Sequence, residues 1–283
     1  MNRNNTINIL EINDIKVKKK FGQNFLHSED ILNKISNATD IENKNVIEIG
    51  PGLGFLTGKL ITKAKKVICY EIDTEMVEYL SEKFKNHKNI EIVSSDFLKV
   101  NLKEEIKEKF NDEKVIIVAN LPYYITTAIL TKVLEETNKV STMIVMMQKE
   151  VALRITGKPS TKDYNGLSVL IQYFTNAKLL FNVSPNCFYP APEVESSVVK
   201  IDRKETIENP AIDLEFFLKF VRNIFIQRRK TLMNNLQNAY KIEKSIFEEG
   251  IKRLNLPLTV RAENLTVEQI VSLSNYIYKQ INS

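Results

Sequence analysis

Residues that bind metal ions or form disulfides are scarce in this chain. Its 283 residues include two cysteines, Cys69 and Cys187, and two histidines, His27 and His87. Their positions match neither a zinc site nor a paired-cysteine motif, so we expect no metal ion and no disulfide. A zinc-dependent base deaminase is disfavoured for the same reason, because its zinc ligands are missing.

Long apolar runs are missing as well. No run reaches the roughly 18 residues that a membrane-spanning helix needs, and residues 1–5 lack the apolar core of a secretion signal. We therefore expect a cytoplasmic protein without a membrane partner. The net charge of +5 is modest. It permits a local nucleic-acid-binding face but does not require one.

Five apolar runs predict the strands of an α/β sheet, because they alternate with helical patterns. They cover residues 46–49, 67–72, 90–93, 115–119 and 140–147. The glycine-rich turn Gly50–Gly54 follows the first run and lets the backbone approach a ligand closely. Phe55 stands where the third glycine of the dinucleotide fingerprint would fall, so a dinucleotide-dependent dehydrogenase is disfavoured.

Four of these runs end in residues suited to binding a ligand: Gly50, Glu71, Asp96 and Asn120. Carboxyl ends of neighbouring strands share one edge of an open α/β sheet, which is where ligands bind. Glu71 lies about 20 residues after the first glycine, where such folds place the acid that holds ribose hydroxyls. Asp96 could accept a hydrogen bond from an adenine amine while Phe97 or Leu98 covers the ring. Alternatively, Asp96 caps the following helix.

The segment Asn120-Leu121-Pro122-Tyr123 has the chemistry to hold a planar amine. Pro122 fixes its own backbone and donates no N–H, so nearby carbonyls can accept hydrogen bonds from a ligand. Asn120 adds a side-chain acceptor and Tyr123 a flat face, which together suit N6 of an adenine. Taken alone, the segment would by default be interpreted as a turn with a buried asparagine and a core tyrosine.

The second half of the chain carries further candidates. Two strand-like runs, residues 177–183 and 196–201, flank a link with three prolines that could hold Phe188 as a second plate against a base. A core aromatic is the equal alternative. From Asp213 onward the pattern is helical, and the last helix opens at Thr266 with capping-box spacing to Gln269. We predict a basic arm over residues 1–20, an α/β domain over 21–205 and a small all-helical domain over 206–283.

Two basic clusters could contact phosphate, or could simply be solvated. The first is Lys18-Lys19-Lys20 and the second is Arg228-Arg229-Lys230.

Together these segments resemble the KsgA family of rRNA adenine N6-dimethyltransferases, a branch of the S-adenosylmethionine-dependent methyltransferases. The resemblance runs from Phe21 to the final helix. It is carried by Gly22–Leu26, Glu48–Gly52, Asn120–Tyr123, Gln148–Ala152 with Arg154, Phe188, and Arg228–Leu232.

The resemblance implies a Rossmann-like class I methyltransferase domain, a helical rRNA-binding domain and S-adenosylmethionine as cofactor. Its cofactor pocket would be lined by Asn24, Leu26, Gly50, Gly52, Glu71, Ile72, Asp96, Phe97 and Asn120. Asn120 and the Leu121 carbonyl would accept hydrogen bonds from the target amine, beside Pro122, while Tyr123 and Phe188 stack on the base. RNA would be bound by Lys18, Lys19, Lys20, Arg154, Arg228, Arg229 and Lys230.

The implied substrate is a pair of adjacent adenines in a hairpin loop near the 3′ end of 16S rRNA, each methylated twice. The partner would be the small ribosomal subunit or its precursor, late in assembly, and the enzyme would be a monomer. One rival is the related 23S rRNA adenine methyltransferase of macrolide resistance. Another is an assembly or transcription factor that keeps the fold but not the chemistry. Residues 1–12 have no assigned role.

Overall fold

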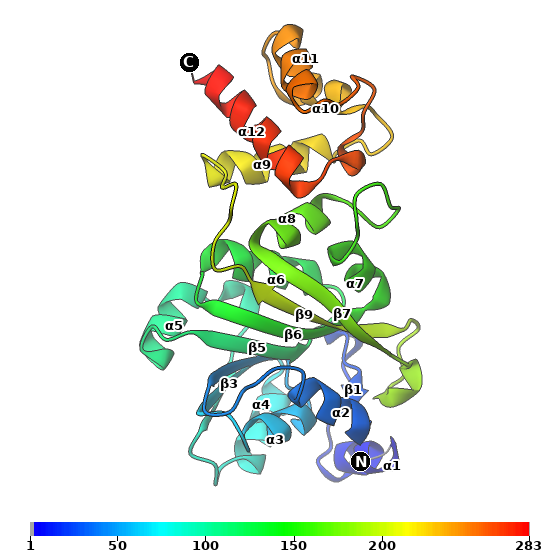
Figure 1. The fold of residues 1–283 in the computed structure, drawn as a ribbon. Coiled ribbons are helices and arrows are strands. Elements are labelled where there is room, and N and C mark those ends of the chain that lie inside the picture. Colours follow the sequence, from blue (N-terminus) through cyan, green and yellow to red (C-terminus); the bar gives the residue numbers. More distant parts are fainter. Residues whose placement is uncertain (1–2, 283) are drawn as a thin grey trace. The chain divides into compact units, whose positions relative to one another are not determined.

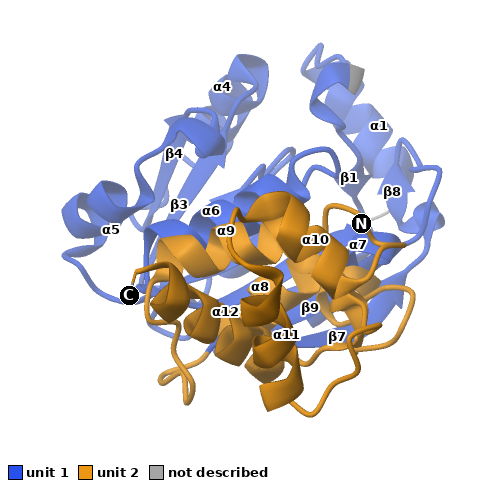
Figure 2. Ribbon diagram, turned by 90° about the horizontal axis from the view of Figure 1, so that it is seen from above, with its two compact units in different colours: residues 1–152, 177–203 blue, residues 153–176, 204–283 orange. Residues whose placement is uncertain are grey.

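The computed structural model describes residues 3–282, apart from the side chain of Lys19. The chain forms two compact units, residues 1–152 with 177–203 and residues 153–176 with 204–283 (Figure 2). Residues 153–176 thus belong to the second unit, although the sequence led us to group them with the α/β domain. The functional assignment of the domains stays a prediction.

The first unit is built on a seven-stranded sheet with the order β4-β3-β2-β5-β6-β9-β7 (Figure 1). The strands β2 to β6 run parallel, and β9 runs antiparallel to β6. Their bounds are β2 Asn45–Ile49, β3 Lys66–Glu71, β4 Ile90–Ser94, β5 Val115–Asn120, β6 Val140–Gln148, β7 Thr175–Val183 and β9 Ser196–Arg203. The predicted α/β, Rossmann-like fold is confirmed. Its strand order reverses between β2 and β5, which is where such sheets bind ligands.

One core of this unit lies between the sheet and its helices. Alternate residues of the strands, such as Val67 with Cys69 and Ile116 with Val118, point to the same face and are buried there. Helical residues such as Leu56 complete this core. The helices of the unit are α2 Glu29–Ser36, α3 Phe55–Leu60, α4 Thr74–Lys83, α5 Leu102–Phe110 and α6 Thr126–Glu136, with α7 Lys149–Ile155 crossing into the second unit.

A short antiparallel pair joins segments far apart in the sequence. The strands β1 Phe25–Leu26 and β8 Phe188–Tyr189 pair Leu26 with Phe188. Before them, residues 3–12 form the helix α1 Arg3–Ile12, which buries Thr6 and Leu10 and contacts β8. These residues of the predicted arm are therefore helical and are anchored on the first unit through two buried side chains. Two buried positions one helical turn apart gave too little periodicity to detect in a polar sequence.

The second unit is helical. It contains α8 Gly166–Phe174, α9 Leu214–Ile224, α10 Leu232–Ala239, α11 Lys244–Arg253 and α12 Val267–Ile281. The helix α9 buries one face, as its spacing predicts, and the capping box of α12 is confirmed. There Gln269 N donates to Thr266 Oγ1 at 3.3 Å, and Thr266 N donates to Gln269 Oε1 at 2.9 Å. Short 3₁₀ turns occupy Lys19–Phe21, Phe97–Lys99, Pro185–Cys187 and Ala262–Asn264.

None of the helices within residues 3–282 has both the length and the apolar character that a bilayer span requires.

Candidate active site

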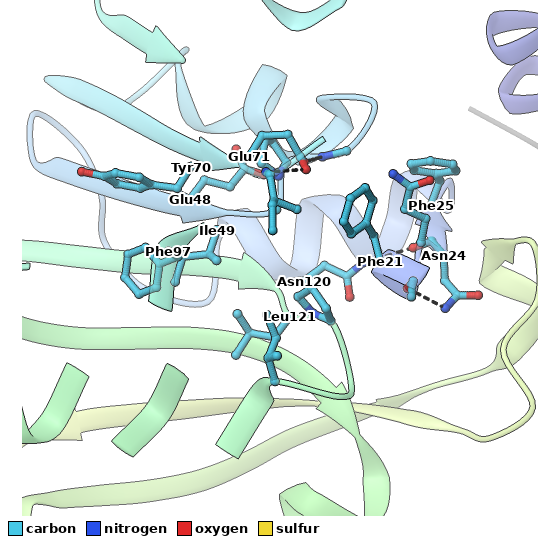
Figure 3. Close-up of a pocket in the computed structure, with 18 of the residues that line it drawn as sticks. Phe21, Asn24, Phe25, Glu48, Ile49, Tyr70, Glu71, Phe97, Asn120 and Leu121 are labelled. Atoms are coloured by element: carbon cyan, nitrogen blue, oxygen red, sulfur yellow. Dashed lines mark hydrogen bonds between the residues drawn. The ribbon is translucent and has the colours of Figure 1, made fainter. Parts of the chain in front are cut away.

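One pocket of the first unit lies at the carboxyl edge of the parallel strands (Figure 3). Its walls come from the segment before β1, the β2–α3 turn, the ends of β3 and β4, and the β5–α6 turn. Every residue predicted for the cofactor lines it, and so do four of the five predicted for the target base, with Asn120 belonging to both sets. They are Asn24, Leu26, Gly50, Gly52, Glu71, Ile72, Asp96, Phe97, Asn120, Leu121, Pro122 and Tyr123. The structure thus brings together residues that are far apart in the sequence, such as Asn24 and Asn120, which are 96 residues apart.

The glycine-rich turn needs its glycines for backbone shape and for close packing. Gly50 and Gly52 have φ angles of +66° and +55°, a region that residues with side chains rarely adopt. A Cβ on Gly52 would lie 3.1 Å from the Phe25 ring, so this aromatic ring packs directly on the turn. The strand β1 therefore packs on the turn, and both line the pocket.

Glu71 is held in place by three backbone N–H groups. Its Oε1 accepts hydrogen bonds from Ile72 N and Asp73 N, both at 2.9 Å, and its Oε2 accepts one from Gly52 N at 3.3 Å. Burial raises the pKa of Glu71, while these three hydrogen bonds lower it. A carboxylate offers about four lone-pair positions, so it can accept further hydrogen bonds from a ligand. This fits the two hydroxyls of a ribose.

The ends of β3 and β4 provide the surfaces that a purine needs. Asp96 Oδ1 accepts a hydrogen bond from Leu98 N at 3.0 Å, so Asp96 caps the following 3₁₀ turn and also lines the pocket. Phe97 is buried and packs edge-on against Tyr70, with ring centroids 5.4 Å apart. Ile72 is 42% exposed, and an apolar side chain left open at a pocket is suited to the face of a ring.

The β5–α6 turn presents the predicted acceptors. Asn120 Nδ2 donates to the carbonyl of Asn24 at 3.2 Å, which orients the carboxamide and leaves Oδ1 as the acceptor (Figure 3). Leu121 N donates to Met146 O at 3.0 Å, which ties the turn to the neighbouring strand. The Tyr123 hydroxyl shares a hydrogen bond of 2.6 Å with Ser196 Oγ. Burial raises the pKa of Tyr123, so its phenol stays neutral at physiological pH.

Tyr124 also lines the pocket, although no role was predicted for it from the sequence. Its side chain is 59% exposed, and its ring lies over Gly22, where an added Cβ would be 3.5 Å away. Partial burial raises its pKa, and the nearby carboxylates of Asp96 and Glu71 raise it further. An exposed aromatic beside both carboxylates can cover a bound nucleoside. The only signal in the sequence was a second tyrosine directly after Tyr123.

Glu48 is a third acid of the pocket, and the sequence predicted no role for it. It is 1% exposed and accepts hydrogen bonds from Thr57 Oγ1 at 2.6 Å and Cys69 Sγ at 3.5 Å. Burial raises the pKa of Glu48 to about 7. Nearby, Lys83 Nζ donates to the carbonyl of Leu53 at 2.6 Å and so fixes the glycine-rich turn. Burial lowers the pKa of Lys83 to about 8.

The basic arm is only partly available to phosphate. Lys18 Nζ lies 2.6 Å from Asp73 Oδ1 and 2.9 Å from Glu75 Oε1, and hydrogen bonds to these two acids raise the pKa of Lys18. Lys18 forms these ion pairs because the start of α4 places two acids beside it, and its contact with RNA stays a prediction. Lys20 Nζ lies 4.7 Å from the centre of the Phe21 ring. The side chain of Lys19 is outside the described part of the chain.

Phe188 does not line the pocket. It is 2% exposed, pairs with Leu26 and packs in the core of the first unit, which matches the alternative of a core aromatic. The prolines do stiffen its surroundings, but pairing between β1 and β8 turns the ring inward. A role as a second plate against the base would require this pair to move.

The basic residues of the second unit differ in their surroundings. Arg228 Nε donates to Glu263 Oε2 at 2.6 Å, and its Nη2 donates to the carbonyls of Thr161 and Lys162. Arg228 therefore fixes a loop, because its side chain reaches both the loop and an acid. Arg154, Arg229 and Lys230 are exposed on this unit, and their contact with RNA stays a prediction.

Comparison with known proteins gives matches along nearly the whole chain. The model of a family described as ribosomal RNA adenine dimethylase matches residues 14–279. Two curated proteins named ribosomal RNA small subunit methyltransferase A are similar to the chain. That of Bacillus cytotoxicus is 42% identical over 277 residues, which are 96% of this chain and 95% of the relative. That of Lactococcus lactis is 43% identical over 273 residues, which are 95% of this chain and 93% of the relative.

Solved structures agree with these matches. A dimethyladenosine transferase from Plasmodium falciparum has a TM-score of 0.77 and 25% identity, covering 90% of this chain and 98% of its own. The 23S rRNA methyltransferase ErmE has a TM-score of 0.69 and 25% identity, covering 90% of this chain and 100% of its own.

Proposed function

The chain belongs to the ribosomal RNA adenine dimethylase family, and from this premise we propose its substrate and the roles of its residues. It is an S-adenosylmethionine-dependent rRNA adenine dimethyltransferase. Its substrate is 16S rRNA, and the target is N6 of two adjacent adenines in the hairpin loop near the 3′ end. The observation that carries the proposal is a single pocket with ribose-binding and purine-binding groups at one end and the acceptors of Asn120-Leu121-Pro122-Tyr123 at the other.

The residues of the pocket fit the cofactor. Glu71 would hold the ribose hydroxyls, since its carboxylate is fixed by backbone N–H groups and retains lone pairs. Asp96 would accept a hydrogen bond from the adenine amine, with Ile72 and Phe97 against the ring. Asn24, Leu26, Gly50 and Gly52 would line the remainder. The cofactor supplies an electrophilic sulfonium methyl group.

The target amine must be oriented, because its lone pair is delocalised into the ring and makes it a poor nucleophile. Asn120 Oδ1 and the Leu121 carbonyl would accept its two hydrogen bonds and so favour a pyramidal nitrogen. The same acceptors stabilise the positive charge that develops on N6 during transfer. No strong base is needed, since the product ammonium loses its proton easily.

The adenine has to leave its stack to enter the pocket. Unstacking costs a few kcal/mol, and stacking on an aromatic side chain contributes about 1–3 kcal/mol per base. Tyr123 would be that platform, because its ring lines the pocket beside Asn120. An adenine in a hairpin loop costs least to unstack, which favours a loop target over a duplex.

The small subunit is favoured as partner over the large one. Curated relatives named after the small subunit are 42% and 43% identical to the chain, whereas the 23S enzyme is 25% identical. Exposed basic residues, among them Arg154, Arg229 and Lys230, would contact phosphates on the subunit or its precursor. We propose that the protein acts as a monomer, in the cytoplasm and late in small-subunit assembly. A factor without chemistry is disfavoured, because the acids and acceptors of the pocket are all present.

Methyl transfer to isolated subunits tests this proposal. Purified protein is incubated with labelled S-adenosylmethionine and with small or large subunits that lack adenine dimethylation. Mass spectrometry of rRNA fragments then maps the label. We expect four methyl groups on two adjacent adenines of the small-subunit hairpin. Label confined to the large subunit, or no label in either, would reject the proposed substrate.

A further inference from the structure

Ser196, on the antiparallel strand β9, contacts Tyr123, which lines the pocket. Because β9 runs against β6, the first residue of β9 lies at the carboxyl edge of the parallel strands. The register places Ser196 opposite Gln148, the last residue of β6, and Asn120 at the end of β5 opposite Met146. Ser196 is therefore brought beside the β5–α6 turn by the sheet itself.

The hydroxyl of Ser196 meets the far end of the Tyr123 ring. The two hydroxyls share a hydrogen bond of 2.6 Å, and Ser196 is 0% exposed. The backbone at this point is anchored as well, since Lys149 N donates to Glu195 O at 3.0 Å and Lys149 Nζ lies 2.7 Å from Glu195 Oε2. Tyr123 itself belongs to a turn between β5 and α6. Its ring thus depends on the sheet for a second point of attachment.

We propose that Ser196 is a positioning residue that fixes Tyr123 as the stacking platform for the target adenine. The inference rests on the proposed function. A tyrosine that is held at its backbone and at its hydroxyl keeps the axis of its ring in one place. Little side-chain entropy is therefore lost when a base stacks on the ring. Ser196 acts only through this hydroxyl and has no role in cofactor binding.

Four variants test the proposal: Ser196→Ala, Tyr123→Phe, the double variant and Ser197→Ala. Tyr123→Phe removes the same hydrogen bond from a half-buried ring and keeps the stacking face. Ser197→Ala is the matched control, because Ser197 is the next residue and equally buried. It points to the other face of β9, where its hydroxyl donates to Asn182 Oδ1 at 2.8 Å.

The first readout is the single-turnover rate of methyl transfer at saturating cofactor. The second is the fluorescence of 2-aminopurine placed at the target position of the hairpin, which falls when the base stacks. Cofactor affinity by equilibrium dialysis and melting temperature complete the set. We expect Ser196→Ala and Tyr123→Phe each to lower the rate roughly 3- to 10-fold, and to weaken the quenching of 2-aminopurine. The double variant should lose no more than either single variant, and cofactor affinity should not change.

Three results would overturn the proposal. Ser196→Ala could transfer methyl groups at the wild-type rate, the two losses could multiply in the double variant, or Ser197→Ala could lose as much as Ser196→Ala. If Ser196→Ala does not fold, Tyr123→Phe decides, and a wild-type rate and quenching would reject the role of this hydrogen bond. Failure of the proposed function has a different signature, since the wild-type protein would then leave small-subunit adenines unmethylated.

Discussion

Replacing Asn120 with alanine tests whether its carboxamide orients the reacting amine. The change removes the Oδ1 acceptor and the 3.2 Å hydrogen bond from Nδ2 to Asn24 O. Loss of one preorganised polar contact to developing charge costs about 2.7–4 kcal/mol, or roughly 10²–10³ in rate. The Leu121 carbonyl remains, so transfer should slow without stopping. Losing the hydrogen bond to Asn24 should cost about 1 kcal/mol of folding stability, a fall of about 2–4 °C in melting temperature.

The assay separates transfer from binding. Single-turnover transfer to small subunits lacking dimethyladenosine gives the rate, and equilibrium dialysis gives the affinity for S-adenosylmethionine, which we expect to stay close to wild type. Asn45→Ala is the matched control, because Asn45 begins β2 at the opposite edge of the sheet and its Nδ2 donates to Glu113 Oε2 at 2.7 Å. It should lose stability but keep its rate. A wild-type rate in Asn120→Ala would remove this residue from the mechanism.

Three further predictions concern the cofactor end of the pocket. Glu71→Ala should weaken S-adenosylmethionine binding at least 10-fold, since hydrogen bonds to a charged acceptor contribute about 1.5–3 kcal/mol each. An unchanged dissociation constant would contradict the proposal that Glu71 holds the ribose hydroxyls. Tyr124→Ala should raise the KM for S-adenosylmethionine roughly 3- to 10-fold, because packing of one ring face contributes about 1 kcal/mol. Tyr124→Phe keeps the ring and should stay near the wild-type KM. Equal KM values in the two variants would show that the ring of Tyr124 does not cover the cofactor. The pKa of Glu48 is raised, so the folded state binds the proton of this carboxyl more tightly than the unfolded chain does. The contribution of Glu48 to the unfolding free energy is therefore fully present below the ordinary pKa of 4.5, and it is lost as the pH rises to about 7. Between about pH 5 and pH 8, Glu48→Gln should therefore gain up to about 3 kcal/mol of unfolding free energy relative to wild type by urea titration; an equal pH dependence in both would contradict a buried acid with a raised pKa.

The sheet could be predicted because its central strands β2, β3 and β5 are buried on both faces and so appear as apolar runs. All five parallel strands begin and end within one residue of the apolar runs in the sequence. The pocket followed from the sheet, since parallel strands bring their carboxyl ends to one edge. Glu71 and Asn120 could therefore be placed together although they belong to different βα units. The capping box of Thr266 was equally local and equally predictable.

Contacts between distant segments could not be predicted. The pairing of β1 with β8 involves two residues in each strand, which is too short to give a periodic pattern in the sequence. Phe188 is buried because it belongs to this pair. The ion pairs of Lys18 depend on where α4 begins, which a run of lysines cannot reveal. Ser196 reaches Tyr123 only because β9 is antiparallel and in a particular register. In each case the residue could be identified in the sequence, but the residue that it contacts in the fold could not.

The central claim is that cofactor and target adenine meet in one pocket at the sheet edge. A structure of the protein with S-adenosylhomocysteine and a small-subunit hairpin RNA measures this directly. We predict ribose hydroxyls on Glu71 and an extruded adenine with its N6 within hydrogen-bonding distance of Asn120 Oδ1. A nucleoside bound elsewhere, or an adenine whose amine lies out of reach of Asn120 while methyl transfer proceeds, would contradict the account.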